Sequence, residues 1–352
     1  MSDITEKSVL DALRRVMDPE LNKDLVALNM IKDIEIVGGK VSFSIELTTP
    51  ACPLRAKIES DARQAVQTIP GIEQVDVKVT ARVRSDGKER NLLKDPVQNV
   101  IAVASGKGGV GKSTVAVNLA ICLAQSGATV GLLDADIYGP NVPTMMGVKR
   151  LPPSPNNTLL PAIAYGVKIM SIGFMVKPDQ PLIWRGPMLH SAIQQFLRDV
   201  EWGCLDYLVV DLPPGTGDVQ LSLAQFLPIS GGLIVTLPQQ VSLEDANRGI
   251  HMFKKMDIPI LGVVENMSYL ELPDGTRMDV FGSGGGESLA NLVGVPFIGR
   301  IPMDAAVRIG GDAGVPIVIA DAESASAKVL RHIAEDVAAR LSVAVLGGEK
   351  KE

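Results

Sequence analysis

The chain has 352 residues, of which 46% are apolar and 21% charged, and its formal net charge is −6. These values predict about two globular domains and exclude disorder over most of the chain. The acidic balance argues against a nucleic-acid partner, because such proteins need a basic surface to neutralise phosphates. No apolar run approaches the roughly 18 residues of a membrane span, and the charged first residues lack a signal-peptide core. The sequence therefore predicts a soluble, cytoplasmic protein with no membrane partner.

Residues 1–80 predict a small α+β domain. The expected elements are helices over residues 9–17 and 54–66, and strands over residues 31–37, 41–47 and 75–79. Asp18-Pro19-Glu20 ends the first helix, because the residue before proline avoids the α region. The first two strands form a hairpin about Gly38-Gly39. The polar and charged stretch 81–98 follows, and it predicts a linker.

From residue 99 to residue 345 the pattern changes to short apolar strands separated by helical stretches. The expected strands cover residues 100–104, 130–133, 207–210, 232–236 and 260–264. This alternation predicts a mainly parallel sheet with helices on both faces. The proline-rich segment 151–162 predicts a loop, and residues 321–345 predict a last helix that packs on the sheet. Residues 346–352 are predicted to be a polar tail.

A complete phosphate-binding loop follows the first of these strands. It matches GxxxxGK[ST] between a strand and a helix, which is the context the motif requires, and its residues are Gly106, Lys107, Gly108, Gly109, Val110, Gly111, Lys112, Ser113 and Thr114. Glycines let backbone N–H groups surround phosphates, and the helix N-terminus adds positive charge. We expect Lys112 to reach the β- and γ-phosphates and Ser113 to offer its hydroxyl to Mg²⁺. The motif predicts a P-loop NTPase.

Aspartates end two of the other predicted strands. Asp134 and Asp136 follow the strand 130–133, and Asp211 ends the strand 207–210. Ligand sites in parallel sheets lie at the carboxyl ends of strands. A carboxylate after the first strand can orient or activate the attacking water, and Asp211 is expected to hold Mg²⁺ through water. The glycine-containing segment 212–218 suits a loop that senses the γ-phosphate and moves on hydrolysis.

Lys107 is a second lysine inside the loop, which the general motif does not require. The pattern GKGGVGKS resembles the deviant Walker A loop of MinD- and NifH-like ATPases, the septum-site, plasmid-partition and nitrogenase iron proteins. In that group the extra lysine contacts the nucleotide across a dimer interface. The resemblance implies a homodimer in which Lys107 stabilises transition-state charge in trans, as an arginine finger does. The alternative is a solvated loop lysine.

Further segments resemble the Mrp/ApbC family of iron–sulfur cluster carrier ATPases: SGKGGVGKST, DADIYGPNVP, WRGPM (184–188), LVVDLPPGTGD and ENMS (265–268). Residues 1–80, with DPE and TPACP, resemble the small iron–sulfur-assembly domain often fused in front. The resemblance implies ATP and Mg²⁺ as cofactors, apo-iron–sulfur proteins as clients, and Asp136 as the catalytic carboxylate with Asp134 in support. It also implies that Asn266 reads the adenine edge, beside a segment containing Pro302 and Asp304. A strand-end cap is the alternative for Asn266.

The chain departs from this family at its cysteines. Family members carry a CxxC pair shortly after ENMS, and two subunits share a [4Fe–4S] cluster through these pairs. Residues 269–277 contain no cysteine, although a cluster normally needs four thiolates. Cys122 and Cys204 are predicted to be structural. Cys52 lies in a turn ahead of a helix, where the thiol pKa can be lowered, so both a cluster or thiol role and a structural role stay open.

Three functions are compatible with these features. The leading one is an ATP-hydrolysing iron–sulfur cluster carrier. The second is a cluster-free, nucleotide-gated adaptor or chaperone for metalloprotein maturation, which the missing cysteine pair favours. The third is a positioning ATPase of the MinD or ParA kind, which depends on a basic DNA-binding face or a membrane-targeting tail.

Overall fold

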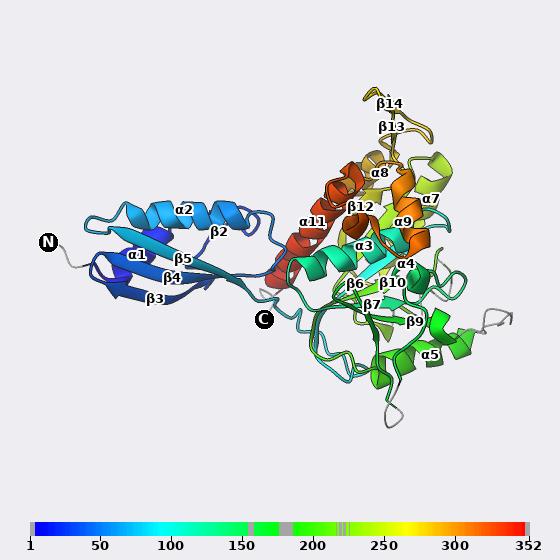
Figure 1. Ribbon diagram of the computed structural model, residues 1–352, viewed down its shortest axis with the longest axis horizontal. Helices are drawn as coiled ribbons and strands as arrows, with labels where there is room; N and C mark the ends of the chain where they lie inside the picture. The colour runs from blue at the N-terminus through cyan, green and yellow to red at the C-terminus, as the bar shows by residue number, and fades with distance from the viewer. Residues whose placement is uncertain are drawn as a thin grey trace. The chain divides into compact units, whose positions relative to one another are not determined.

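The computed structural model describes residues 4–153, 158–175, 186–215, 217, 220, 223–224 and 226–348. The chain divides into two compact units, one made of Met1–Arg84 with Ala338–Glu352 and one made of Ser85–Val337 (Figure 1). None of the described helices has the length and apolar character that a bilayer crossing requires.

The N-terminal unit is built on a three-stranded sheet. Its elements are α1 (Glu6–Leu13), β1 (Met17–Asp18), β2 (Lys23–Asp24), β3 (Ile31–Val37), β4 (Lys40–Leu47), α2 (Arg55–Gln67) and β5 (Gln74–Ala81). β3 and β4 form the predicted hairpin, and β5 pairs parallel to β4. The alternating buried side chains of β4 form a core with apolar residues of α1 and α2. The predicted α+β fold is confirmed.

The first helix begins and ends earlier than the sequence pattern predicts, at Glu6 and Leu13 instead of residues 9 and 17. α1 ends at Leu13, and Met17 pairs with Asp24 in the short β1–β2 hairpin. The cause is local, because the Asp18 carboxylate accepts hydrogen bonds from the backbone N–H groups of Glu20 and Leu21 at 2.9 and 3.0 Å. Such a side-chain turn competes with the helix.

The second unit contains an eight-stranded sheet in the order β15-β12-β11-β6-β10-β7-β9-β8. Its strands are β6 (Val97–Ser105), β7 (Val130–Asp134), β8 (Ala162–Ala164), β9 (Val167–Ser171), β10 (Leu205–Asp211), β11 (Gly231–Thr236), β12 (Ile260–Glu265) and β15 (Phe297–Arg300). Every pair is parallel except β8 with β9. The mainly parallel sheet is confirmed, and sequence reasoning missed β8, β9 and β15. A separate two-stranded hairpin joins β13 (Leu270–Glu271) to β14 (Arg277–Met278).

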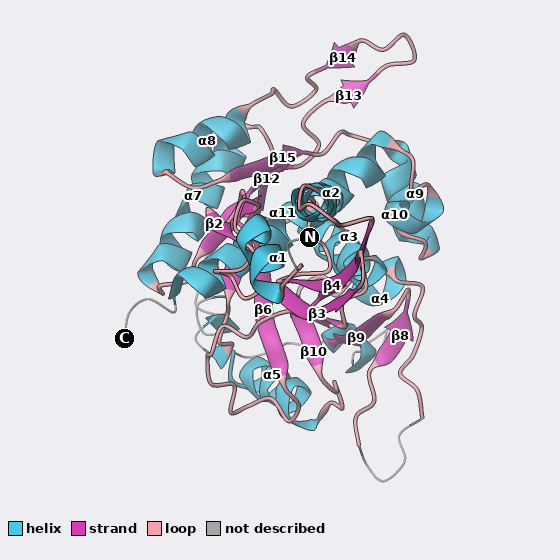
Figure 2. Ribbon diagram, turned by 90° about the vertical axis from the view of Figure 1, so that its left-hand side faces the viewer, coloured by secondary structure: helices cyan, strands magenta, loops and turns pink. Residues whose placement is uncertain are grey.

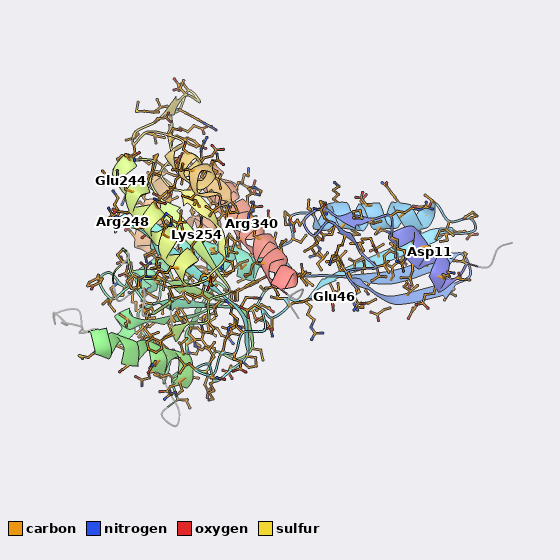
Figure 3. All side chains as sticks on the ribbon, turned by 180° about the vertical axis from the view of Figure 1, so that it is seen from behind. Asp11, Glu46, Glu244, Arg248, Lys254 and Arg340 are labelled. Atoms are coloured by element: carbon orange, nitrogen blue, oxygen red, sulfur yellow. The ribbon has the colours of Figure 1, made fainter. Side chains whose placement is uncertain are left out.

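Helices cover this sheet (Figure 2). They are α3 (Lys112–Gln125), α4 (Val142–Met145), α5 (Gly186–Asp199), α7 (Gln240–Lys255), α8 (Gly285–Val293), α9 (Ala305–Ala313), α10 (Ile317–Ala320) and α11 (Ala325–Gly348), with the 3-10 turn η2 (Ile172–Met175). Val100, Ala102 and Ala104 of β6 share one core with α5 and α7. Because strand side chains alternate, the intervening residues of β6 face the other layer. Glu244, Arg248 and Lys254 lie on the outer face of α7 (Figure 3).

Much of the stretch 81–98, which the sequence predicts as a linker, is held to the second unit by ion pairs and hydrogen bonds. Arg90 and Asp86 form a buried ion pair at 2.8 Å, and Arg90 also donates to the Ser230 hydroxyl at 2.9 Å. The Asp95 carboxylate accepts a hydrogen bond from the Gly203 N–H at 2.7 Å. The last two linker residues, 97–98, begin β6, and residues 346–348 of the predicted tail belong to α11.

Candidate active site

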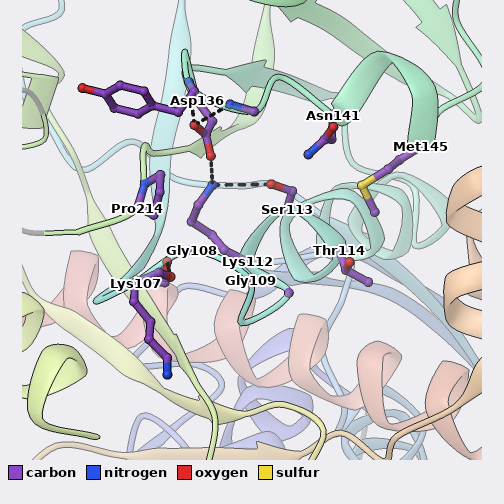
Figure 4. Close-up of a pocket in the computed structure, with 14 residues that line it drawn as sticks. Lys107, Gly108, Gly109, Lys112, Ser113, Thr114, Asp136, Asn141, Met145 and Pro214 are labelled. Atoms are coloured by element: carbon purple, nitrogen blue, oxygen red, sulfur yellow. Dashed lines mark hydrogen bonds and ion pairs between the residues drawn. The ribbon is translucent and has the colours of Figure 1, made fainter. Parts of the chain in front are cut away.

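The carboxyl ends of three adjacent strands meet at one cavity of about 350 Å³ (Figure 4). The phosphate-binding loop follows β6, Asp136 follows β7, and Pro214 follows Asp211 at the end of β10. Because β10 lies between β6 and β7 in the sheet, chain segments about 100 residues apart converge here. The structure thus brings together the loop and the acidic residues that the sequence singled out.

Two glycines of the loop are required by its geometry. Gly111 caps the N-terminus of α3 with a φ of +84°, a conformation that other residues rarely adopt. A Cβ atom on Gly106 would lie 2.2 Å from the backbone of Asp245, so only glycine fits against α7. These positions explain why the loop needs glycine even where no phosphate contact is involved.

Lys112 and Ser113 point toward the acidic residues. The Lys112 ammonium group lies 2.5 Å from Asp211 Oδ1 and 3.4 Å from Asp136 Oδ2, and only 5% of its side chain is exposed. The Ser113 hydroxyl donates to Asp211 Oδ2 at 2.5 Å. Burial raises the Asp211 pKa, although the charge of Lys112 acts against this. One lysine is therefore shared by two aspartates at the place where phosphates are expected.

Asp134 and Asp136 differ in their surroundings. Asp136 lines the cavity, and its Oδ1 accepts the N–H groups of Tyr138 and Gly139 at 3.1 and 3.2 Å. Asp134 is completely buried, with one oxygen bonded to the Asp136 N–H at 3.1 Å and the other to the Ser171 hydroxyl at 2.7 Å. Burial, and then the charge of Asp211, raise the Asp134 pKa to about 8. Asp134 thus supports the turn that holds Asp136.

The raised pKa of Asp134 predicts a pH-dependent stability. Between its unfolded pKa near 3.8 and its folded pKa of about 8, the folded protein binds more protons, so stability falls as pH rises through this window. In Asp134→Asn this contribution disappears. As the pH rises from 6 to 9, we expect the unfolding free energy of the variant to rise by about 3 kcal/mol relative to that of the unmutated protein. Urea unfolding followed by fluorescence of the buried Trp202 measures this. Identical pH profiles for the two proteins would contradict the assignment.

Lys107 is partly exposed at the rim of the cavity. Its side chain is directed away from Lys112 and Asp136 (Figure 4). Its ammonium group makes no hydrogen bond or ion pair with the residues that the structure describes. Its predicted action on a nucleotide held by a second subunit stays a prediction.

The residues predicted to surround the base do not line the cavity. The Asn266 amide donates to the Val110 carbonyl at 2.8 Å. Asp304 caps α9, accepting from the Ala306 N–H and the Ser326 hydroxyl, both at 2.8 Å. Pro302 is buried beside it. Their contacts with adenine stay predictions.

Sequence reasoning missed some residues of this site. Ser171, whose hydroxyl donates to Asp134, ends a strand that was not predicted, and its position directly after the apolar pair Ile169-Met170 is a usable signal. Asn141 and Tyr138 line the cavity and belong to the quoted segment DADIYGPNVP. Other motif residues lie outside the described residues: Trp184, Arg185, Thr216 and Asp218.

The cysteines differ in exposure. Cys122 is buried, and burial raises its pKa to about 12, in line with the predicted structural role. Cys52 is half-buried, and its carbonyl accepts from the Arg55 N–H at the start of α2. Cys204, which the sequence favours as structural, is exposed. Within the described parts of the chain, no three His, Cys, Asp or Glu residues form a group that could hold a metal ion.

Known proteins share both parts of the chain. Residues 96–338 match the family described as NUBPL iron-transfer P-loop NTPase, and residues 6–79 the family described as iron-sulfur cluster assembly protein. A Synechocystis protein named "Iron-sulfur cluster carrier protein" is 54% identical, covering 97% of this chain and 99% of the relative. The nucleotide-binding protein from Archaeoglobus fulgidus, solved with ADP, is 38% identical with a TM-score of 0.57 over 65% of this chain and 90% of its own. The cell division ATPase MinD from Pyrococcus furiosus is 25% identical with a TM-score of 0.51, covering 68% and 98%. The predicted P-loop fold is confirmed.

Proposed function

Because the chain belongs to the NUBPL family of iron-transfer P-loop NTPases, we propose that it is an ATP-hydrolysing carrier that delivers iron–sulfur clusters to apoproteins. One observation carries the proposal: the chain matches a relative named as an iron–sulfur cluster carrier almost from end to end. The acidic and basic groups around the phosphate-binding loop support it. A protein that had kept only the fold would have no need of a buried Lys112 beside Asp136 and Asp211.

Binding of ATP would break the ion pair between Lys112 and Asp211 and form a new one between Lys112 and the phosphates. Lys112, paired with Asp211 in this structure, would turn to the β- and γ-phosphates and leave the Asp211 carboxylate with the Ser113 hydroxyl. These two groups are hard oxygen donors, so they fit Mg²⁺. When bound, Mg²⁺ neutralises charge on the phosphate oxygens. Ser113 would hold it directly, and Asp211 through water.

Asp136 would position the attacking water. Its Oδ1 is occupied by two backbone N–H groups, whereas Oδ2 faces Lys112 on the cavity side. A carboxylate with one fixed oxygen and one available oxygen can orient a water molecule and accept its proton. In a homodimer, the partner subunit's Lys107 would stabilise the charge that develops on the γ-phosphate.

Hydrolysis would be transmitted through the segment after Asp211. The Leu212 N–H donates to the Val103 carbonyl at 3.0 Å, and the Gly215 N–H donates to the Ser105 carbonyl at 2.9 Å. This segment is therefore hydrogen-bonded to β6, the strand that leads into the phosphate-binding loop. Loss of the γ-phosphate would release such a loop and change the dimer geometry. That change is the proposed trigger for cluster release to a client.

The cluster is the cargo, and its ligands are the open part of this proposal. Cys52 from each subunit of a dimer would supply two thiolates, so a four-thiolate cluster would need further ligands from a client or a small thiol. The missing CxxC pair therefore also favours a second function, a cluster-free adaptor for metalloprotein maturation. A positioning ATPase is less favoured, because the chain is acidic overall and α7 exposes charges of both signs.

Iron and acid-labile sulfide measured after anaerobic reconstitution test the cargo role. If Cys52 is a cluster ligand, Cys52→Ala will lose the bound iron and sulfide, together with the visible absorption of the cluster. Cys204→Ala is the matched control, since it removes an exposed thiol at another place. Iron bound equally by both variants would exclude Cys52, and iron bound by no form, including the unmutated protein, would favour the adaptor.

A further inference from the structure

The side chain of Asn266 is attached to the phosphate-binding loop itself. Its Nδ2 donates to the Val110 carbonyl at 2.8 Å, and the side chain is buried. A carbonyl oxygen can only accept, so the NH₂ end of the amide must face it. A Cβ atom on Gly111 would lie 2.1 Å from the same Nδ2, which shows how closely the amide approaches the residue before Lys112.

The rest of the protein can hold a phosphate-binding loop in place only through hydrogen bonds to certain backbone groups of the loop. Its N–H groups must stay available for phosphate oxygens, so the carbonyl groups are the ones that the protein can hold. Among the residues that the structure describes, two side chains hold carbonyl groups of the glycine-rich turn 106–111. The Ser105 hydroxyl donates to the Lys107 carbonyl at 3.0 Å, and Asn266 donates to the Val110 carbonyl. The two contacts lie at opposite ends of the glycine-rich turn.

The position of Asn266 is itself well determined. Its backbone N–H donates to the backbone carbonyl of Thr236, at the end of the neighbouring strand β11, at 2.8 Å. The adjacent Glu265 is completely buried, and its carboxylate accepts from the Ser268 hydroxyl and from the Gly286 N–H at 2.6 Å. Met267 follows with a φ of +49°, a conformation that persists only where the surroundings enforce it. Asn266 therefore projects from a fixed frame at the end of β12.

We propose that Asn266 is a positioning residue for the phosphate-binding loop, which orders the loop from Val110 to Lys112 whatever base the nucleotide carries. The proposal rests on the proposed nucleotide-binding function and adds a role to the predicted contact with adenine. Without the amide, the buried Val110 carbonyl loses the hydrogen bond from Asn266, and the C-terminal end of the glycine-rich turn loses this attachment. The N–H groups that bind phosphate would then be less well ordered before the ligand arrives.

Binding of a ligand without a base separates the two roles. The dissociation constants of MgATP and of magnesium tripolyphosphate are measured for the unmutated protein, Asn266→Ala and Asn266→Asp. We expect each variant to bind both ligands more weakly by the same factor, about tenfold. Asn291→Ala replaces an exposed asparagine of α8 that does not line the cavity, and it is the control; its affinity for both ligands should not change.

Backbone hydrogen exchange without nucleotide gives a second, independent readout. We expect faster exchange over residues 106–113 in both Asn266 variants, and unchanged exchange over residues 31–47 of the N-terminal unit, which reports intact folding. Weaker ATP binding with unchanged tripolyphosphate binding, or unchanged exchange in the loop, would overturn the positioning role. If the unmutated protein bound neither ligand, the proposed function would fail, and the exchange data would still decide the role of Asn266.

Discussion

Replacing Lys107 with alanine is expected to lower ATP turnover about 10³-fold or more while leaving ATP binding measurable, because a transition-state charge is lost but Lys112 remains. Lys107 is partly exposed and makes no ion pair within the described residues. Its removal should therefore change stability by no more than about 0.5 kcal/mol. Single-turnover hydrolysis and equilibrium ATP binding, measured on the same preparation, give the two quantities.

Mixing two inactive variants tests whether Lys107 acts across a dimer interface. Lys107→Ala keeps its own Asp136, and Asp136→Asn keeps its own Lys107, so a mixed dimer has one complete site if the lysine acts in trans. Random pairing should then restore about a quarter of the unmutated activity. If Lys107 acted within its own subunit, the mixture would stay inactive. Equal turnover in Lys107→Ala and the unmutated protein would remove the catalytic role altogether.

The sequence predicts the central part of this fold well because each element carries a local signal. The strand 100–104, the glycine-rich loop and the helix after it all follow from residue type and spacing, and they appear as β6 and α3. The strands β9 and β15 were missed because other residues interrupt their short apolar stretches, Lys168 in VKIMS and Gly299 in FIGR. Periodicity cannot distinguish such interrupted stretches from loops.

In the site too, the sequence predicts which residues come together but not how their surroundings differ. The motif assigns Lys112, Ser113 and the acidic residues to one place, and the structure brings them within hydrogen-bonding distance. The sequence could not separate Asp134 from Asp136 by physical argument, because the two differ only in what surrounds them after folding. Burial against Ser171 and Asp211 is a tertiary property, and it raises the pKa of Asp134. The attachment of Asn266 to Val110 joins residues 156 positions apart, which no local pattern reports.

Asp134 is enclosed by protein whereas Asp136 lines the cavity, so replacing each with asparagine should affect turnover differently. Asp136→Asn should lower the turnover number about 10²-fold or more, because an amide cannot accept the proton of the attacking water. ATP affinity should change little, since Lys112 and the loop remain. Asp134→Asn should leave turnover within about threefold, because Asp134 is completely buried, does not line the cavity, and an amide of the same shape keeps its hydrogen-bonding positions.

The structural contacts explain why both variants should fold. In Asp136→Asn the new amide oxygen could still accept the N–H groups of Tyr138 and Gly139, and in Asp134→Asn the amide could still serve the Asp136 N–H and the Ser171 hydroxyl. Turnover numbers and Michaelis constants for the two variants, measured side by side with MgATP, separate the roles. If Asp134→Asn lost as much turnover as Asp136→Asn, the supporting role assigned to Asp134 would be wrong. Because only Asp136 both lines the cavity and keeps an oxygen directed toward Lys112, the geometry favours a loss confined to Asp136.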